Sequence, residues 1–148
     1  MKKAFTMIEL IFVIVIIGIL SSIAISKMAA TRDDAIITKG RSQVAAIRNA
    51  IALVKSVNMM KGSASYPTKL DTLATATATS GKLFDSDGTN KLLDYPIYAK
   101  NTSGHWTKAA TNKYNFVYQG NNIQFTYNSA DGSFDCDHTK QTCKDLTE

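Results

Sequence analysis

Two cysteines near the end of the chain could close a loop or bind a metal ion. Cys136 and Cys143 enclose six residues, and His138 is one of them. A disulfide between the cysteines would close a short loop, which is feasible in an oxidising compartment. The alternative is a zinc site that uses both cysteines and His138. Such a site needs four ligands, and the fourth could come only from an acid or from the distant His105. We expect a disulfide and no metal.

The remaining polar residues do not form a recognisable catalytic motif. The chain has no glycine-rich phosphate-binding loop, no H-E-x-x-H and no G-x-S-x-G. Neither His105 nor His138 has a nucleophile arranged beside it in the sequence, so we expect both at the surface. A length of 148 residues also excludes a catalytic α/β barrel and a two-domain cofactor enzyme. We therefore expect a protein that is not an enzyme and needs no cofactor.

One acidic segment resembles part of a calcium-binding loop. Asp85 and Asp87 are two residues apart and precede Gly88. An EF-hand loop also requires a third ligand before the glycine and a glutamate six residues after it, and both are missing. We expect an ordinary turn over 85–90.

The elements that position these residues begin with a long apolar segment. The 22 residues from Phe5 to Ser26 contain one ionisable side chain, Glu9. About 20 helical residues cross the roughly 30 Å hydrocarbon core of a membrane. Lys2 and Lys3 precede the segment without an acid nearby, so the positive-inside rule predicts a cytoplasmic N-terminus. Everything after Lys27 would then lie outside the cytoplasm, where disulfides persist.

A cleaved secretory signal peptide would also start with basic residues and an apolar run. This run is longer than the usual 7–15 residues, and no A-x-A site is followed by an abrupt change to a folded domain. Instead a helical pattern continues, with apolar residues spaced by seven, three, four and three on one face. These residues are Ile37, Val44, Ile47, Ile51 and Val54. We expect one long helix that ends near Lys61 and Gly62.

The residues that follow predict a small α+β head. Tyr66–Leu73 has proline in its first turn and predicts a short second helix. Tyr114–Tyr118 and Ile123–Tyr127 are aromatic-rich and predict strands joined by a turn at Gly120–Asn122. A third strand is expected over Ser133–Cys136.

The aromatic face of this meander needs a partner. The stripe of Ile47, Ile51 and Val54 on the long helix is the expected one. Tyr95–Tyr98 and Trp106 are expected to pack along the connecting loop. The predicted fold class is α+β, with a long N-terminal helix packed on a small antiparallel β-meander.

At the start of the chain, Met1-Lys-Lys-Ala4 precedes Phe5-Thr-Met-Ile-Glu9-Leu10. These ten residues resemble the class III leader of type IV pilins and type II secretion pseudopilins. In that family a membrane peptidase removes a short basic leader before a phenylalanine. The new terminal amine is then methylated, and a glutamate four residues further on guides assembly. The resemblance therefore implies cleavage between Ala4 and Phe5, N-methylation of Phe5 and an assembly role for Glu9.

The resemblance extends from Met1 to about Val57, with two departures from the family pattern. Ala4 stands where the family usually has glycine, and Ile25 and Ser26 stand where many pilins have proline. The implied organisation is a leader over 1–4, a transmembrane segment over 5–26, an amphipathic helix over 27–61 and a head over 62–148. Pilins often close a C-terminal loop with a disulfide, which agrees with the cysteine spacing.

The function implied by the resemblance is that of a pilin-like structural subunit. It would assemble into a type II secretion pseudopilus or a related type IV filament. The alternatives are a pseudopilin for DNA uptake in natural transformation and a minor type IV pilin for adhesion or motility. Expected partners are a prepilin peptidase and methylase, further copies of the chain, other pilin-like subunits, a membrane assembly platform and lipid. The chain would cross the inner membrane once, with its head in the periplasm.

The formal net charge of +5 gives weak support for DNA as a further partner. Residues 32–69 carry a local charge of +5, whereas residues 131–148 carry −3. A basic stem and an acidic tail favour contacts between copies as much as nucleic-acid binding. A solvated helix face explains the basic stem most simply.

Overall fold

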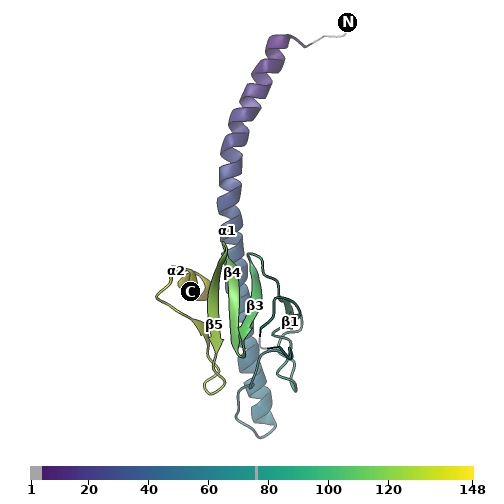
Figure 1. Ribbon diagram of the computed structural model, residues 1–148, viewed down its shortest axis with the longest axis vertical. Helices are drawn as coiled ribbons and strands as arrows, with labels where there is room; N and C mark the ends of the chain where they lie inside the picture. Colours follow the sequence, from purple (N-terminus) through teal and green to yellow (C-terminus); the bar gives the residue numbers. More distant parts are fainter. Residues whose placement is uncertain (1–4, 76) are drawn as a thin grey trace. The chain divides into compact units, whose positions relative to one another are not determined.

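The computed structural model describes residues 5–75 and 77–148, except for the side chains of Ser26, Ala29 and Ala30. The chain forms two compact units, and the division falls between Ala35 and Ile36. Helix α1 (Met7–Met60) contributes residues to both units. The other elements belong to the second unit: β1 (Lys82–Leu83), β2 (Ile97–Tyr98), β3 (His105–Ala110), β4 (Lys113–Tyr118), β5 (Asn121–Tyr127), β6 (Phe134–Cys136) and α2 (Gln141–Thr147) (Figure 1). The predicted α+β class is confirmed.

Helix α1 ends where the sequence predicts, at a glycine cap. Gly62 adopts a φ of 86°, which is in the left-handed region that a residue with a Cβ rarely occupies. The backbone N–H of Gly62 donates to the carbonyl of Met59, and that of Ser63 donates to the carbonyl of Asn58. This pair of hydrogen bonds is a Schellman motif, which satisfies carbonyls that the last helical turn leaves free.

The main sheet is an antiparallel meander with the strand order β3-β4-β5-β6. Strands β4, β5 and β6 confirm the three predicted strands. The turn between β4 and β5 starts one residue earlier and ends two residues earlier than predicted, because Gln119 and Gly120 take the positive φ values and β5 already begins at Asn121. Two successive residues with positive φ form the type I′ turn that matches the twist of a two-residue hairpin.

The placement of Trp106 in a connecting loop was wrong. Trp106 lies in β3, where it pairs with Phe116 of β4, and its side chain is fully buried. Its ring nitrogen donates to the side-chain oxygen of Gln43 on α1 over 3.0 Å. The sequence of β3 also contains Lys108 and two alanines, which have low β-propensity, so pairing with β4 determines this strand. The loop expected over Tyr95–Tyr98 contains β2, which pairs with β1.

The prediction of a helix over Tyr66–Leu73 was also wrong, because the segment has no helical residues. Its carbonyl groups accept hydrogen bonds from side chains of β5 and of the turn between β3 and β4. The Tyr127 hydroxyl donates to the Pro67 carbonyl over 2.6 Å, and the Asn112 amide donates to the Thr68 carbonyl over 3.0 Å. Carbonyl groups bound in this way do not form the i to i+4 hydrogen bonds of a helix. Contacts with the sheet therefore override the local helix signal.

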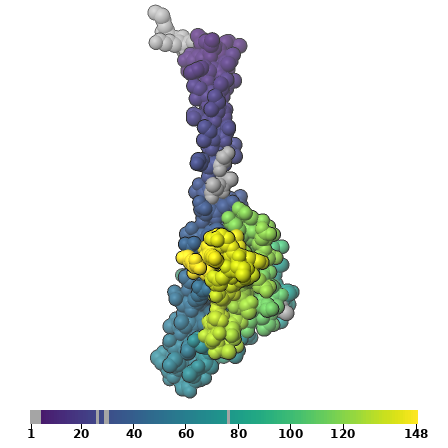
Figure 2. Space-filling model, turned by 90° about the vertical axis from the view of Figure 1, so that its left-hand side faces the viewer, coloured from purple at the N-terminus to yellow at the C-terminus, as the bar shows by residue number. Residues whose placement is uncertain are grey.

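The core of the second unit lies between α1 and the sheet, as predicted. Figures 1 and 2 both show the strands lying along the part of α1 that belongs to this unit. Ile47, Ile51 and Val54 are buried against the aromatic face of the sheet. The buried aromatic side chains are Phe84, Trp106, Tyr114, Phe116, Phe125, Tyr127 and Phe134. Each fully buried side chain of this kind stabilises the fold by about 1.5–3 kcal/mol relative to exposure.

Candidate functional site

The start of α1 contains the residues to which the sequence assigns processing and assembly. Thr6 precedes the first helical residue, and its hydroxyl oxygen accepts the backbone N–H of Glu9 over 3.3 Å. A threonine at the N-cap followed three residues later by a glutamate is the arrangement of a capping box. The sequence pattern T-x-x-E could have predicted this cap. Thr6 therefore fixes the point at which the helix begins.

Phe5 and Glu9 lie within one turn of the helix start. The Phe5 side chain is 78% exposed, and Glu9 is exposed in the first turn. Residues four apart lie on the same face of a helix, and a carboxylate is favoured near a helix N-terminus. Phe5 precedes the helix, whereas Glu9 lies in its first turn. Ala4, the predicted residue before the cleaved bond, lies outside the described residues.

The segment Met7–Ile25 is long and apolar enough to cross a membrane. Its 19 residues span about 28 Å as a helix, close to the thickness of a hydrocarbon core. None of these residues is buried within the protein, so the apolar side chains face outward on every side of the helix. A helix that is apolar all round requires lipid or other helices around it. These features suggest a single-pass membrane anchor, as in pilins.

The disulfide predicted from the sequence is present. Cys136 at the end of β6 is bonded to Cys143 in α2, and their Cα atoms are 5.9 Å apart. Cys143 and Leu146 are the buried residues of α2. The short helix α2 was not predicted, because seven residues are too few to show helical periodicity. The disulfide therefore links α2 covalently to the end of β6.

Two arginines of α1 hold the same C-terminal region by hydrogen bonds to its backbone. Arg41 donates two hydrogen bonds to the Asp145 carbonyl over 2.9 and 2.7 Å. Arg48 donates to the Phe134 carbonyl over 3.0 Å and to a carboxylate oxygen of Asp135 over 3.1 Å. The sequence shows these arginines only as part of a basic stem. In the structure they join that stem to the acidic tail of the same chain.

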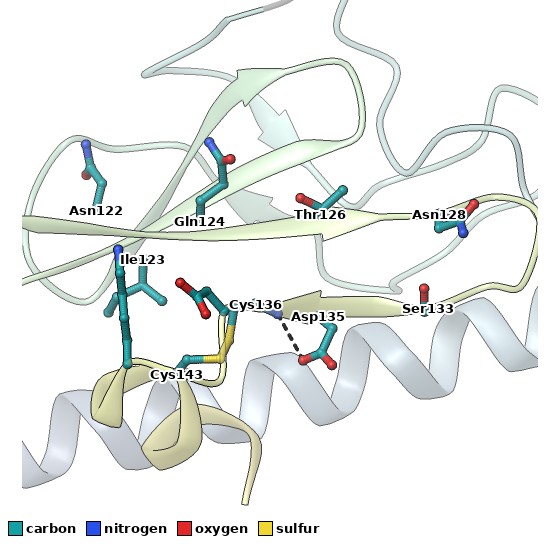
Figure 3. A pocket seen from close by; sticks show the side chains of 11 residues that line it. Asn122, Ile123, Gln124, Thr126, Asn128, Ser133, Asp135, Cys136 and Cys143 are labelled. Carbon is teal, nitrogen blue, oxygen red and sulfur yellow. Dashed lines mark hydrogen bonds between the residues drawn. A yellow bond between two sulfur atoms is a disulfide. The ribbon is translucent and has the colours of Figure 1, made fainter.

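An open groove lies beside the disulfide (Figure 3). It has a volume of about 510 Å³ and is lined by the polar side chains of β5 and by both cysteines. Asp135 lies next to the disulfide, and the backbone N–H of Cys136 donates to its carboxylate. The same carboxylate contacts the Nε2 atom of His138 over 2.9 Å. Because both cysteines are bonded to each other, the zinc site considered for Cys136, His138 and Cys143 is not formed in this oxidised state.

The other histidine is less exposed than the sequence predicts. His105 is half-buried at the start of β3, and its Nδ1 atom lies 3.1 Å from the Thr102 hydroxyl. Hydrogen bonding at a turn explains this position without a chemical role.

The acidic segment over 85–90 forms a turn, as predicted. One oxygen of Asp87 accepts the backbone N–H groups of Thr89 and Asn90. Burial raises the pKa of the Asp87 carboxyl, but the hydrogen bonds from Asn90 and Thr89 outweigh it and hold this pKa below its usual value. Asp85 accepts the backbone N–H and the hydroxyl of Thr72. Both carboxylates therefore position loops.

Sequence reasoning missed a buried polar cluster under the sheet. The carboxylate of Asp71 contacts the Lys108 ammonium group and accepts a hydrogen bond from the Tyr114 hydroxyl. Lys108 also donates to the Leu73 carbonyl over 3.1 Å. These residues are distant in the sequence, and their types alone carry no signal that they would meet. Their contacts join the 66–73 segment to β3 and β4.

Comparison with known proteins identifies the N-terminal segment. Residues 1–25 match the prokaryotic N-terminal methylation motif, which is the class III prepilin leader of type IV pilins and pseudopilins. The match contains Phe5, Glu9 and the whole apolar segment Met7–Ile25. Neither the curated proteins nor the solved structures yielded a match to this chain.

Proposed function

Because residues 1–25 carry the prokaryotic N-terminal methylation motif, we propose that this chain is a structural subunit of a type II secretion pseudopilus or a related type IV filament. The motif and the α+β fold support a type IV pilin-like or pseudopilin subunit. In this function the chain is not an enzyme. A prepilin peptidase removes residues 1–4 and methylates Phe5, and the subunit then assembles with copies of itself and with other pilin-like subunits.

The exposed apolar segment is a second observation that supports this proposal. Met7–Ile25 presents apolar side chains on all sides, and a lipid bilayer covers them before assembly. Neighbouring copies of the same helix cover them in a filament. The N-terminus faces the cytoplasm, the head lies in the periplasm, and a membrane assembly platform extracts the subunit from the bilayer.

Glu9 is the residue that we expect to guide assembly of the subunit into the filament. A carboxylate at the bilayer centre costs about 2.5–3.5 kcal/mol, and a position near the helix end costs less. Within one chain, the Thr6 hydroxyl caps the helix by accepting the backbone N–H of Glu9, and the Glu9 carboxylate lies in the first turn, where negative charge is favoured. In a filament its carboxylate pairs with the methylated amine of Phe5 on a neighbouring copy. This contact neutralises both charges away from water and sets the axial position of the next subunit.

We further propose that the filament is a secretion pseudopilus. A compact head on one membrane helix suits a secretion pseudopilus. The alternatives are a pseudopilin for DNA uptake and a minor pilin for adhesion or motility. The basic side chains of Arg41 and Arg48 bind the chain's own backbone, which leaves fewer cations of the stem for DNA.

The test is the substitution Glu9→Gln, which removes the charge and keeps the size of the side chain. We expect the variant to insert into the membrane and to lose its leader as the wild type does. Its incorporation into sheared filaments should fall at least tenfold, measured by immunoblot against the membrane fraction. Glu9→Asp is the matched control, because it keeps the charge. Normal incorporation of the Gln variant would overturn the proposed role of the carboxylate.

A further inference from the structure

We propose that Asp135, Cys136, His138 and Cys143 form a zinc-binding site when the disulfide is reduced. The site would take one Zn²⁺ ion per chain in the dithiol state and would close the C-terminal loop in place of the disulfide. This inference concerns the second unit alone. It holds whether or not the chain assembles into a filament.

The ligand atoms already lie close together. Each of three residues, Asp135, His138 and Cys143, offers one ligand atom, and these three atoms lie within 4.8 Å of one another. Cys136 is bonded to Cys143. In a tetrahedral zinc site, nitrogen and oxygen ligands are about 3.3 Å apart and two sulfur ligands about 3.8 Å apart. The His138 Nε2 atom lies 2.9 and 3.1 Å from the two oxygens of Asp135. The histidine and the carboxylate therefore need little movement, and the two sulfur atoms must separate.

The backbone can accommodate that separation. The Cα atoms of Cys136 and Cys143 are 5.9 Å apart, and residues 137–140 between them form an exposed loop that leads into α2. Cys136 lies at the end of β6, whereas Cys143 is in α2. Rotation about the Cα–Cβ bonds moves the sulfur atoms apart without a shift of either element.

Asp135 has the hydrogen bonds expected of a supported metal ligand. Its Oδ1 atom accepts the backbone N–H of Cys136 over 2.9 Å and the guanidinium of Arg48 over 3.1 Å. Its Oδ2 atom lies 3.1 Å from His138 Nε2. When Nε2 binds zinc as a neutral imidazole, Oδ2 can bind the same ion while Oδ1 keeps its two donors. Such supporting hydrogen bonds orient ligands in known metal sites.

The groove in Figure 3 provides access to the disulfide. Asp135 and both cysteines line it, and it is open to solvent. Cys136 is half-buried and Cys143 is fully buried, so a small dithiol would attack the Cys136 sulfur from this side, and a hydrated metal ion can follow. The chemistry balances: the disulfide accepts two electrons and two protons from the dithiol, which becomes a disulfide. Both protein thiols then release their protons when zinc binds their sulfurs.

The neighbouring acid Asp137 is not part of the site. Its Oδ1 atom accepts the backbone N–H of Thr139 over 3.0 Å and the Thr139 hydroxyl over 2.8 Å. The Thr139 hydrogen bonds hold the pKa of the Asp137 carboxyl below its usual value. Asp137→Asn keeps an oxygen acceptor for Thr139, so this variant is a matched control for a lost negative charge in the same loop.

The test uses the full chain in detergent, reduced with a phosphine and titrated with Zn²⁺ against a chromophoric chelator. We expect one zinc ion per reduced chain and none for the oxidised chain. His138→Gln should weaken zinc binding at least tenfold, and Asp137→Asn should bind zinc as the wild type does. With Co²⁺ as a probe, the reduced chain should show a thiolate charge-transfer absorption that the oxidised chain lacks.

Two results would overturn the proposal. One is a reduced chain that binds no stoichiometric zinc, with Trp106 fluorescence showing that the protein remains folded. The other is a His138→Gln variant with wild-type affinity, since the thiols alone would then explain binding. The His138 side chain is 45% exposed, so its substitution leaves the core intact and the comparison valid.

Discussion

The ammonium group of Lys108 lies 2.7 Å from a carboxylate oxygen of Asp71, and the two side chains are only 6% and 2% exposed. The second oxygen of Asp71 accepts the Tyr114 hydroxyl. The pair therefore neutralises two charges inside the second unit. Removal of one partner from such a pair leaves an uncompensated buried charge, which costs about 3–5 kcal/mol.

This pair predicts a non-additive mutational effect. Lys108→Met should destabilise the protein by about 3–5 kcal/mol, because the Asp71 carboxylate then has no counter-charge. Adding Asp71→Asn should recover part of that loss, since an amide oxygen can still accept the Tyr114 hydroxyl and needs no cation. Urea unfolding followed by the fluorescence of Trp106, the chain's one tryptophan, measures both variants. Additive losses in the double variant would contradict the assignment of a coupled pair.

Two buried tyrosines predict how stability depends on alkaline pH. Burial, followed by the hydrogen bond and the charge of Asp71, raises the pKa of Tyr114. Burial, with Tyr66 and Asp131 nearby, also raises the pKa of Tyr127. The folded-state pKa of each exceeds the unfolded value of about 10. Their contribution to stability is therefore complete below about pH 10 and is lost as the pH rises above it.

We expect the melting temperature to fall steeply above about pH 10 and to fall less in Tyr127→Phe than in the wild type. Below that pH the variant also loses the hydrogen bond to the Pro67 carbonyl, so each variant is compared with itself across the pH range. Thermal scans at a series of pH values measure this slope. An equal slope in the two proteins would show that Tyr127 ionises normally in the folded state.

The disulfide predicts a local loss of stability when both cysteines are replaced by serine. A closed loop with a sequence separation of 7 contributes about 2–3 kcal/mol in the chain-entropy model. Arg41 and Arg48 still donate hydrogen bonds to the backbone of β6 and α2, so the sheet should stay folded. We expect α2, which has lost its covalent link, to become sensitive to protease first. Limited proteolysis with mass detection measures the order of cleavage. Two titratable thiols in the native wild-type chain would contradict the disulfide.

The methylation motif predicts the mature N-terminus. We expect the native chain to begin at Phe5 and to carry a methylated amine there, because the matched motif implies removal of residues 1–4. Intact-mass analysis together with sequencing of the N-terminal peptide measures both features. A chain that begins at Ile25 or Thr31 would instead indicate cleavage by a signal peptidase after Ala24 or Ala30.

The features that the sequence determined are those encoded by neighbouring residues. Three of these features determine the helix within a few turns: the apolar segment, the stripe of Ile47, Ile51 and Val54, and the glycine at 62. The aromatic alternation that predicts β4 and β5 is also local. Local periodicity sets these elements because each one buries its own apolar face. The leader motif is local as well, so it could be recognised without a structure.

Contacts between distant segments decided the rest. Strand β3 forms because β4 lies beside it, and 66–73 is not helical because Tyr127 and Asn112 bind its carbonyl groups. Asp71 meets Lys108, 37 residues away, only after the sheet has formed. Pairing of buried charges depends on three-dimensional proximity, which single-sequence patterns do not encode. The sequence already grouped the two cysteines with His138, whereas only the tertiary structure added Asp135 and the hydrogen bond to it from Arg48 of α1.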